Sequence, residues 1–221
     1  WAYLWEKSVW FFDHQAIINL ILFGQYNALL RNTLAQVETQ RSARLLQLTC
    51  VYGKLTPSLL QHTRNEVHLC DVAEGQLQLA RSKVADRCHL TRMNAESLAY
   101  TGDAFDQVIV FFLFHELPTA ARQHVYGEIA RVVRVGGSVL VTEYASTPRH
   151  HWLFRFSLTR CLLEHLEPFL AGFWREDVTE KLNVALRNRD KRLKGSPQVT
   201  PCFAGFYRVM RFDVEAAKVV A

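Results

Sequence analysis

The chain has 221 residues, 49% of them hydrophobic and 21% charged, which is the composition of a folded domain and not of a disordered or fibrous chain. Its net charge of +5 is mildly basic and favours an anionic partner, either a nucleic acid or an acidic membrane surface. Five scattered cysteines without a CxxC pair argue against a disulfide framework or a cysteine zinc site, and indicate a reducing compartment.

No apolar run reaches the ~20 residues that a membrane-spanning helix needs, and no secretory signal pattern opens the sequence. Residues 6–36 have apolar side chains at helical spacing, with Gly24 as a break that divides the helix in two. This segment is also rich in aromatic residues.

After residue 40 the hydrophobic period changes to that of short strands. Residues 44–51 predict a strand, Gly53 a turn, and Thr56 and Pro57 the N-cap and first residue of a helix. Further strands are expected at 66–71, 88–93, 105–112 and 138–144, helices at 73–85 and 119–133, and a turn at Gly136-Gly137. This alternation predicts an α/β fold with a mostly parallel, doubly wound sheet of the Rossmann-like kind.

The last part of the chain departs from this alternation. Residues 150–192 read as a helical insertion, and residues 204–212 as a strand that pairs at the sheet edge. We therefore expect one domain in three parts: a helical lid at 1–40, a ligand-binding core at 44–145, and a helical insertion at 150–195 that faces the substrate.

Ligands of such sheets bind beyond the carboxyl ends of the strands, so the residues at those ends are the candidate site. Asp71 ends the second strand, where a carboxylate matches the two hydroxyls of a ribose; the alternative is an N-cap for the next helix. Asn94, Ala95 and Glu96 end the third strand and are placed to hydrogen-bond an adenine ring.

Together these motifs resemble the class I S-adenosylmethionine-dependent methyltransferases, particularly their quinone C-methyltransferase branch. The matches are Asp71, Asn94-Ala95, Phe105-Asp106 and Gly136-Gly137, in order, across about residues 44–145. The resemblance implies S-adenosylmethionine as the cofactor. The residues then expected to bind it are Gln47, Val51, Tyr52, Gly53, Asp71, Val72, Asn94, Ala95, Glu96 and Phe111.

The turn after the first strand departs from that family. The family pattern is an acidic residue followed by three alternating glycines, whereas this chain has Gln47 in the acidic position and retains only Gly53. Val51 and Tyr52 place side chains where glycines let the backbone approach the ligand. Either the turn has been rebuilt for another reaction, or the fold has become non-catalytic.

A second resemblance covers nearly the whole chain. The runs INLILFGQY, VYGKLT, FLFHELP and FAGFYRV are similar to the rhodoquinone-biosynthesis proteins, which are methyltransferase-like in fold. This resemblance implies that a ring methoxy group of ubiquinone is replaced by an amino group. It further implies that S-adenosylmethionine supplies the nitrogen and that manganese assists.

Three side chains at the ends of the fourth and fifth strands are candidate metal ligands: His115, Glu116 and Glu143. In the alternative, the HELP run only begins a helix and Glu143 pairs with an arginine. The candidate catalytic residues are Tyr52, His115 and Glu143, where Tyr52 either orients the substrate or packs under the first helix.

Ubiquinone is a lipid, so we expect a peripheral protein that meets the membrane surface through the first helix and the aromatic residues of 150–173. The expected location is the cytoplasmic face of a bacterial inner membrane, or the mitochondrion. Three other functions remain open: a conventional quinone methyltransferase, a non-catalytic accessory protein and, on charge alone, a nucleic-acid modifier. No basic strip with interleaved aromatics supports the last, and no nucleic-acid partner is expected.

Overall fold

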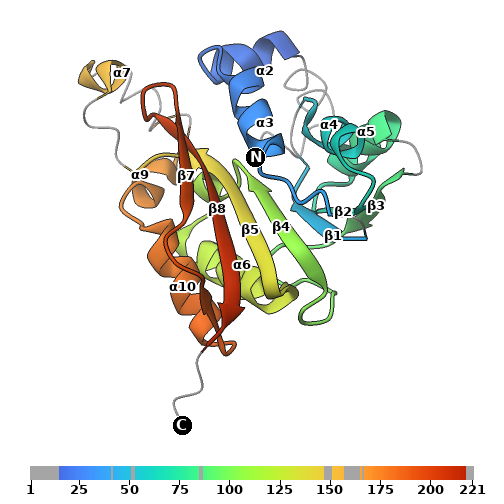
Figure 1. Cartoon of the computed structure of the whole chain (residues 1–221). Helices are drawn as coiled ribbons and strands as arrows, with labels where there is room; N and C mark the ends of the chain where they lie inside the picture. The colour runs from blue at the N-terminus through green and yellow to red at the C-terminus, as the bar shows by residue number, and fades with distance from the viewer. Residues whose placement is uncertain are drawn as a thin grey trace.

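The structure, a computed structural model, describes residues 15–40, 42–50, 53–84, 87–146, 151–156, 165 and 167–217. One sheet with the strand order β3-β2-β1-β4-β5-β8-β6 crosses the molecule, and β7 pairs with β8 (Figure 1). The strands are β1 (Arg44–Leu48), β2 (Glu66–Asp71), β3 (His89–Arg92), β4 (Phe105–Phe111), β5 (Val133–Tyr144), β6 (Lys191–Leu193), β7 (Gln198–Cys202) and β8 (Tyr207–Ala216).

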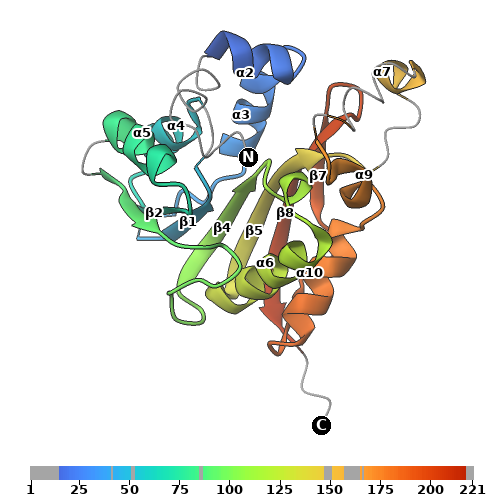
Figure 2. The ribbon, with the colours of Figure 1, turned by 180° about the vertical axis from the view of Figure 1, so that it is seen from behind.

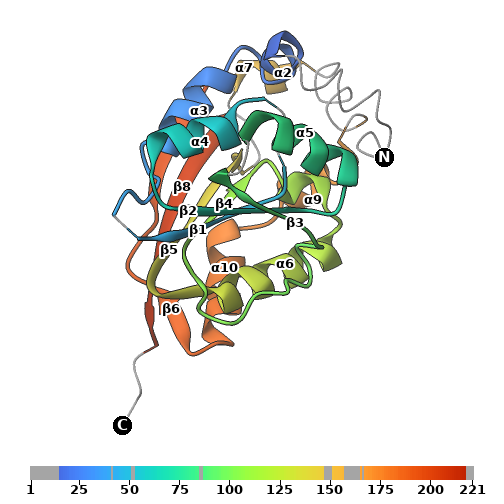
Figure 3. The same ribbon diagram turned by 90° about the vertical axis from the view of Figure 1, so that its right-hand side faces the viewer.

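Helices cover both faces of this sheet (Figures 2 and 3). Helices α3, α4 and α5 lie on one face and α6 and α10 on the other, as Figure 3 shows edge-on. The helices are α2 (Gln15–Ile21), α3 (Tyr26–Leu34), α4 (Leu55–His62), α5 (Glu74–Val84), α6 (Thr119–Val132), α7 (Trp152–Arg155), α9 (Leu170–Phe173) and α10 (Val178–Arg187), with a 3-10 turn, η3, at Phe114–Glu116.

The predicted doubly wound, mostly parallel sheet is confirmed. Strands β1 to β5 pair in parallel, and β8 alone of the long strands runs antiparallel, against β5. The inner strands β1 and β4 are almost wholly buried, as their continuous apolar runs require. This order brings the carboxyl ends of β1, β2 and β4 side by side at one edge.

Three predicted details of the elements were wrong. Gly136-Gly137 does not precede β5 but lies inside it, where a Cβ on Gly137 would come within 2.6 Å of the Asp106 carbonyl oxygen. Thr56 is not an N-cap, because α4 begins one residue earlier and the Thr56 hydroxyl donates to Gln47. The final strand is not at the sheet edge, since β8 lies between β5 and β6.

The predicted break at Gly24 is confirmed: Phe23 and Gly24 have φ of 50° and 78°, which ends α2 before α3 begins. Residues 1–14 of that segment, and most of 157–166 in the insertion, lie outside the described residues. Within the described part of the chain, no helix has the length and apolarity needed to cross a bilayer.

Candidate functional site

The turn that follows β1 keeps a glycine-like backbone without most of its glycines. Thr49 has φ of 67°, a left-handed conformation that is costly for a β-branched residue. Gly53 has φ of 91°, and a Cβ there would lie 2.6 Å from the Tyr26 hydroxyl oxygen. Because that hydroxyl accepts a hydrogen bond from the Lys54 N–H at 2.6 Å, α3 supports the turn directly. The predicted site residues Val51 and Tyr52 lie outside the described residues.

Gln47 hydrogen-bonds to this turn and to the helix that follows it. Its side chain is fully buried, its Oε1 accepts from the Thr56 hydroxyl at 3.0 Å, and its Nε2 donates to the Thr49 carbonyl oxygen at 3.0 Å. A carboxylate cannot donate this second bond. The amide therefore braces the turn as a neutral group, and the negative charge expected from the family pattern is absent.

Asp71 connects the ends of β1 and β2. Its two carboxylate oxygens accept from the backbone N–H of Cys50 at 2.6 Å and of Ala73 at 2.8 Å. Burial raises the pKa of Asp71, and these backbone hydrogen bonds partly oppose the rise. Ala73 precedes α5, so its bond to Asp71 is a local turn bond and not the N-cap that the alternative expected; the bond to Cys50 ties the carboxylate to the turn. Each oxygen keeps a further lone pair for a ligand hydroxyl.

The other predicted nucleotide contacts differ in their surroundings. Val72 is 55% exposed beside Asp71, and Asn94 to Glu96 form a tight turn after β3 in which the Asn94 Oδ1 accepts from the Glu96 N–H at 2.9 Å. Phe111 is fully buried at the end of β4, edge-on to Tyr26. Val72 and Asn94 therefore remain available to a ligand, whereas Phe111 supports the floor of the site.

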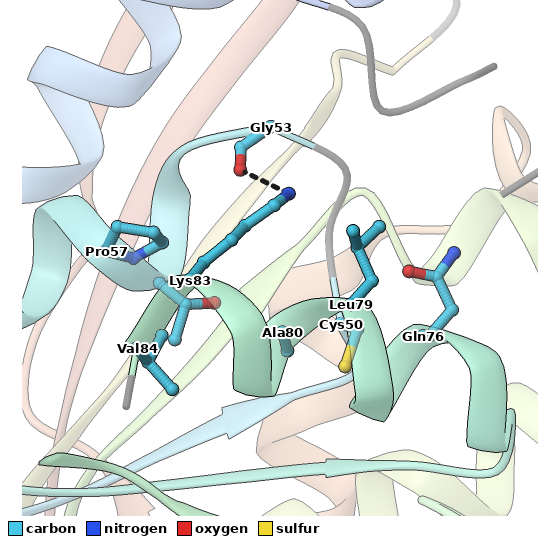
Figure 4. Close-up of a pocket in the computed structure, with 9 residues that line it drawn as sticks. Cys50, Gly53, Pro57, Gln76, Leu79, Ala80, Lys83 and Val84 are labelled. Carbon is cyan, nitrogen blue, oxygen red and sulfur yellow. Dashed lines mark hydrogen bonds between the residues drawn. The ribbon is translucent and has the colours of Figure 1, made fainter. Parts of the chain in front are cut away.

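A pocket lies between this turn and α5 (Figure 4). Cys50 and Gly53 line it from the turn, and Lys83 reaches across from α5 to donate to the Gly53 carbonyl oxygen at 3.1 Å. Burial raises the pKa of the Cys50 thiol, which excludes a thiolate role at neutral pH. Cys50, Cys70, Cys88 and Cys202 are all free, as predicted for them.

His115 and Glu143 form a buried pair at the ends of β4 and β5. The His115 Nδ1 lies 2.8 Å from the Glu143 Oε1, and the two side chains are 4% and 0% exposed. Glu143 also accepts backbone N–H groups, from Tyr144 at 2.8 Å and Phe114 at 3.1 Å. The structure thus brings these two predicted site residues into direct contact, and the alternative pairing of Glu143 with an arginine is not observed among the described residues.

Glu167 completes this cluster and was missed in the sequence. Its Oε2 lies 3.9 Å from the His115 Nε2. Burial raises the pKa of Glu167 above its usual value. For His115, burial alone lowers the pKa, but the charge and hydrogen bond of Glu143 outweigh it and raise the pKa to about 9. His115 is therefore protonated at neutral pH. No local pattern marks Glu167, which precedes α9, far along the chain from η3.

The predicted manganese ligands do not fit a shared ion in this geometry. Among the described residues, the group of three whose ligand atoms all lie within 4.8 Å of one another is elsewhere, at Glu66, His68 and His89. The His115 Nδ1 and both oxygens of Glu143 are already engaged in hydrogen bonds, and Glu116 is partly exposed in η3. The chemistry considered below therefore uses no metal ion.

The comparisons with known proteins show similarity to methyltransferases. Residues 45–137 match a family described as a methyltransferase domain. The chain is 32% identical over 138 residues to a demethylmenaquinone methyltransferase of Lactiplantibacillus plantarum, covering 59% of this chain and 57% of that protein. It is 28% identical over 134 residues to a ubiquinone/menaquinone biosynthesis C-methyltransferase of Yersinia enterocolitica, covering 58% and 53%. The chain thus spans little more than half the length of these relatives.

Solved structures share the fold at low sequence identity. An O-methyltransferase family protein from Burkholderia thailandensis aligns with a TM-score of 0.66 at 14% identity, over 97% of this chain and 64% of that chain. A protein described as a 4+2 cyclase, SpnF, aligns with a TM-score of 0.58 at 16% identity, over 87% and 81%. These likenesses establish the class I methyltransferase fold, and they show that the fold alone does not determine the reaction.

Proposed function

We propose that the chain is an S-adenosylmethionine-dependent transferase that acts on a quinone, because residues 45–137 match a methyltransferase-domain family and the chain has the class I methyltransferase fold. Two relatives named for quinone methylation support the quinone as acceptor. Asp71, linked to the β1 turn through the Cys50 N–H, supports a nucleotide bound at this edge.

Within this class we propose that the chain replaces a methoxy group of ubiquinone by an amino group taken from S-adenosylmethionine, giving rhodoquinone. The observation that carries this proposal is Gln47. A carboxylate in its place would stabilise the methionine ammonium, whereas the buried neutral amide gives it no charge support. The amine pKa then falls, and the neutral amine is a nucleophile.

The amine nitrogen adds to the ring carbon that bears the methoxy group, and methoxide leaves and takes a proton to become methanol. Loss of the methionine Cα proton then moves two electrons into the quinone ring and gives an imine. Water hydrolyses the imine, so that the products are an aminohydroquinone, which is the two-electron-reduced form of rhodoquinone, and a 2-oxo acid that still carries the sulfonium. Dioxygen in the assay then takes two electrons and two protons from the hydroquinone, which gives rhodoquinone and hydrogen peroxide.

The buried pair supplies a cation for this addition. Negative charge develops on a quinone carbonyl oxygen as the amine attacks. The Nδ1 of His115 is hydrogen-bonded to Glu143, and its Nε2 lies near Glu167. The Nε2 proton can then be donated to the developing oxyanion. In this role the imidazolium does what the resemblance assigns to manganese, and full activity in the presence of a chelator would agree with it.

A conventional quinone C-methyltransferase is the second candidate, and the names of the two relatives favour it. The two reactions give different products from the same reagents. In amination, the quinone exchanges OCH3 for NH2, whereas in methylation it gains CH2. Incubation of the protein with S-adenosylmethionine and either a short-tailed ubiquinone or a demethylquinone, followed by mass spectrometry, identifies the reaction. A methylated quinone as the sole product would exclude the amination proposal.

We further propose that the protein takes its lipid substrate from a membrane surface. Helices α2 and α7 lie at the same end of the molecule, the end toward which β4 and β5 run (Figures 1 and 3). Both carry exposed apolar side chains: Leu20 is 77%, Trp152 55% and the neighbouring Phe156 58% exposed. Of the other predicted aromatics of this region, Phe169 is 39% exposed, whereas Phe173 is buried at 1% and belongs to the core. Arg149 and Arg160 lie outside the described residues.

Flotation with anionic liposomes tests this docking. The parent should float, and a Trp152→Ser, Phe156→Ser double variant should stay largely in the soluble fraction. Val135→Ser is the matched control, because Val135 is 45% exposed near the start of β5, at the opposite end of the sheet. A parent that stays soluble, or a double variant that floats as well as the control, would contradict the proposal.

A further inference from the structure

Three metal-ligating side chains meet at the end of the sheet opposite the candidate site. Glu66 and His68 lie two residues apart on β2 and therefore share one face of the sheet. His89 begins β3 and pairs directly with His68 in the parallel register. The strand pairing itself thus brings one carboxylate and two imidazoles together.

The distances among these three side chains suit one shared ion. The Glu66 Oε1 lies 2.6 Å from the His68 Nε2 and 3.7 Å from the His89 Nε2. The three ligand atoms all lie within 4.8 Å of one another. Ligands bonded at about 2.0–2.2 Å to a tetrahedral zinc ion are roughly 3.3–3.5 Å apart. Small rotations of Glu66 and His89, which are 44% and 64% exposed, are enough to reach that arrangement.

His68 is the buried member of the three, at 8% exposed. Its Nδ1 lies 3.5 Å from the Tyr100 hydroxyl, which is placed to orient the imidazole so that its Nε2 faces Glu66. Arg44 is a nearby cation. It lies 3.6 Å from the other carboxylate oxygen of Glu66, is 42% exposed, and leaves Oε1 facing the two imidazoles.

We propose that Glu66, His68 and His89 bind a divalent transition-metal ion of the zinc class, with water completing its coordination. Two imidazoles and one carboxylate suit zinc, cobalt or nickel better than manganese or magnesium. Glu66 and Asp71 occupy opposite ends of β2, about 17 Å apart at the usual rise of a strand. The ion is therefore separate from the transferase chemistry. It fastens the short edge strand β3 to β2, and through β3 it steadies the turn at Asn94.

Calorimetric titration of the full chain with zinc chloride tests this site. The parent should bind one equivalent with enthalpy unaffected by S-adenosylmethionine. Both His89→Ala and Glu66→Gln should weaken binding by about tenfold or more. His124→Ala is the matched control. His124 is about as exposed as His89, at 66%, and lies 3.1 Å from Glu96. Among the described residues, this pair has no third metal-binding side chain within the same distance.

Cobalt provides the second readout. Absorption bands of cobalt bound to nitrogen ligands should appear with the parent and His124→Ala, and be lost with His89→Ala, while circular dichroism shows all three folded. If the parent fails to bind zinc, or His89→Ala binds it as the control does, the proposal is overturned. Neither result bears on the quinone reaction, which is measured without added metal.

Discussion

Asp71 is the residue on which the nucleotide site depends most directly. Its carboxylate already accepts two backbone N–H groups, which fix its position beside the β1 turn. Asp71→Asn removes the negative charge and replaces one acceptor oxygen with an NH2 group. That group faces a backbone N–H, with which it cannot form a hydrogen bond. A hydrogen bond to a charged group contributes about 1.5–3 kcal/mol, so we expect S-adenosylmethionine to bind about 10- to 100-fold more weakly in calorimetry.

The control for this variant is Asp106→Asn. Asp106 also accepts a backbone N–H, that of Arg44 at 2.7 Å, but at the opposite end of the sheet. This variant should lose some stability and keep its affinity for S-adenosylmethionine. Equal losses of affinity in both variants would show that Asp71 has only a structural role.

His115 gives the protein a specific dependence of stability on pH. Glu143, with Glu116 and Glu167, raises the pKa of His115 from about 6.5 to about 9 in the folded protein, against the effect of burial. Because the pKa of His115 is higher in the folded than in the unfolded protein, the proton on His115 stabilises the fold. This stabilisation is complete below the unfolded-state pKa and is lost as the pH rises through about 9. We expect the parent to lose on the order of 3 kcal/mol of unfolding free energy between about pH 6 and 10 through this group.

Urea denaturation at the two pH values measures this change, and His115→Gln removes it. Since other groups titrate in both proteins, the quantity of interest is the difference between parent and variant. His124→Gln, which alters an exposed histidine, should follow the parent. If His115→Gln showed the parent's full pH dependence, the assignment of a protonated His115 would be wrong.

Among the elements, the turn after β1 carries the proposed change from methyl transfer to amination. Gln47→Glu restores the charge of the family pattern but places a buried carboxylate against the Thr49 carbonyl oxygen. We expect amination to slow at least about tenfold, because the methionine ammonium regains a partner worth roughly 1–2 kcal/mol or more. Quinone product formation at neutral pH measures this effect.

Gln107→Glu separates this effect from lost stability. Gln107 is as fully buried as Gln47, on the neighbouring strand β4, and its Nε2 donates to the Gln36 carbonyl oxygen at 3.1 Å. Both variants should unfold more easily, and only Gln47→Glu should lose amination beyond its loss of folded protein. If the amination rate per folded Gln47→Glu molecule equalled that of the parent, the proposed role of Gln47 would be wrong.

The sequence predicted most elements because their patterns are local. Hydrophobic periodicity predicted the bounds of β2 correctly, and the bounds of β1, β4 and α6 to within a few residues. What depends on distant contacts was not predictable. Gly137 is glycine because β5 approaches the Asp106 carbonyl, and Thr56 turns inward because Gln47 lies beneath it. The position of β8 between β5 and β6 likewise depends on strand pairing that no local pattern records.

The candidate-site residues were likewise predictable only where a local pattern marks them. Asp71, His115 and Glu143 were recognisable because each lies at or just after the end of a predicted strand, where this fold binds ligands. Glu167 reaches His115 from the insertion, and the proposed ligands Glu66, His68 and His89 meet only through the register of β2 and β3. The predicted metal ligands His115, Glu116 and Glu143 do not surround one ion, because Glu143 binds His115 and the backbone of η3.

At the scale of the whole molecule, Arg122 attaches the insertion to the core. It is 1% exposed on α6, and its Nε and Nη2 donate to the Glu176 Oε1 at 3.0 and 2.6 Å. Its Nη1 donates to the Phe114 carbonyl oxygen in η3 at 3.4 Å. Arg122→Met leaves Glu176 buried without its partner, so the free energy of unfolding should fall by about 3–5 kcal/mol.

Chemical denaturation checks this prediction against a surface pair. Arg192→Met breaks an ion pair with Glu215 in which both side chains are more than a third exposed, and should cost no more than about 1 kcal/mol. If the two variants lost equal stability, Arg122 would not have the linking role that its contacts indicate.

Isotope labelling separates the proposed transfer of nitrogen from a transfer of methyl. The reaction is run with S-adenosylmethionine labelled with 15N in the amine and 13C in the sulfonium methyl, and with a short-tailed ubiquinone as acceptor. The proposed amination gives a quinone product that carries 15N, has lost one methoxy group and contains no 13C. A product that carries 13C and no 15N would contradict it and identify the protein as a methyltransferase.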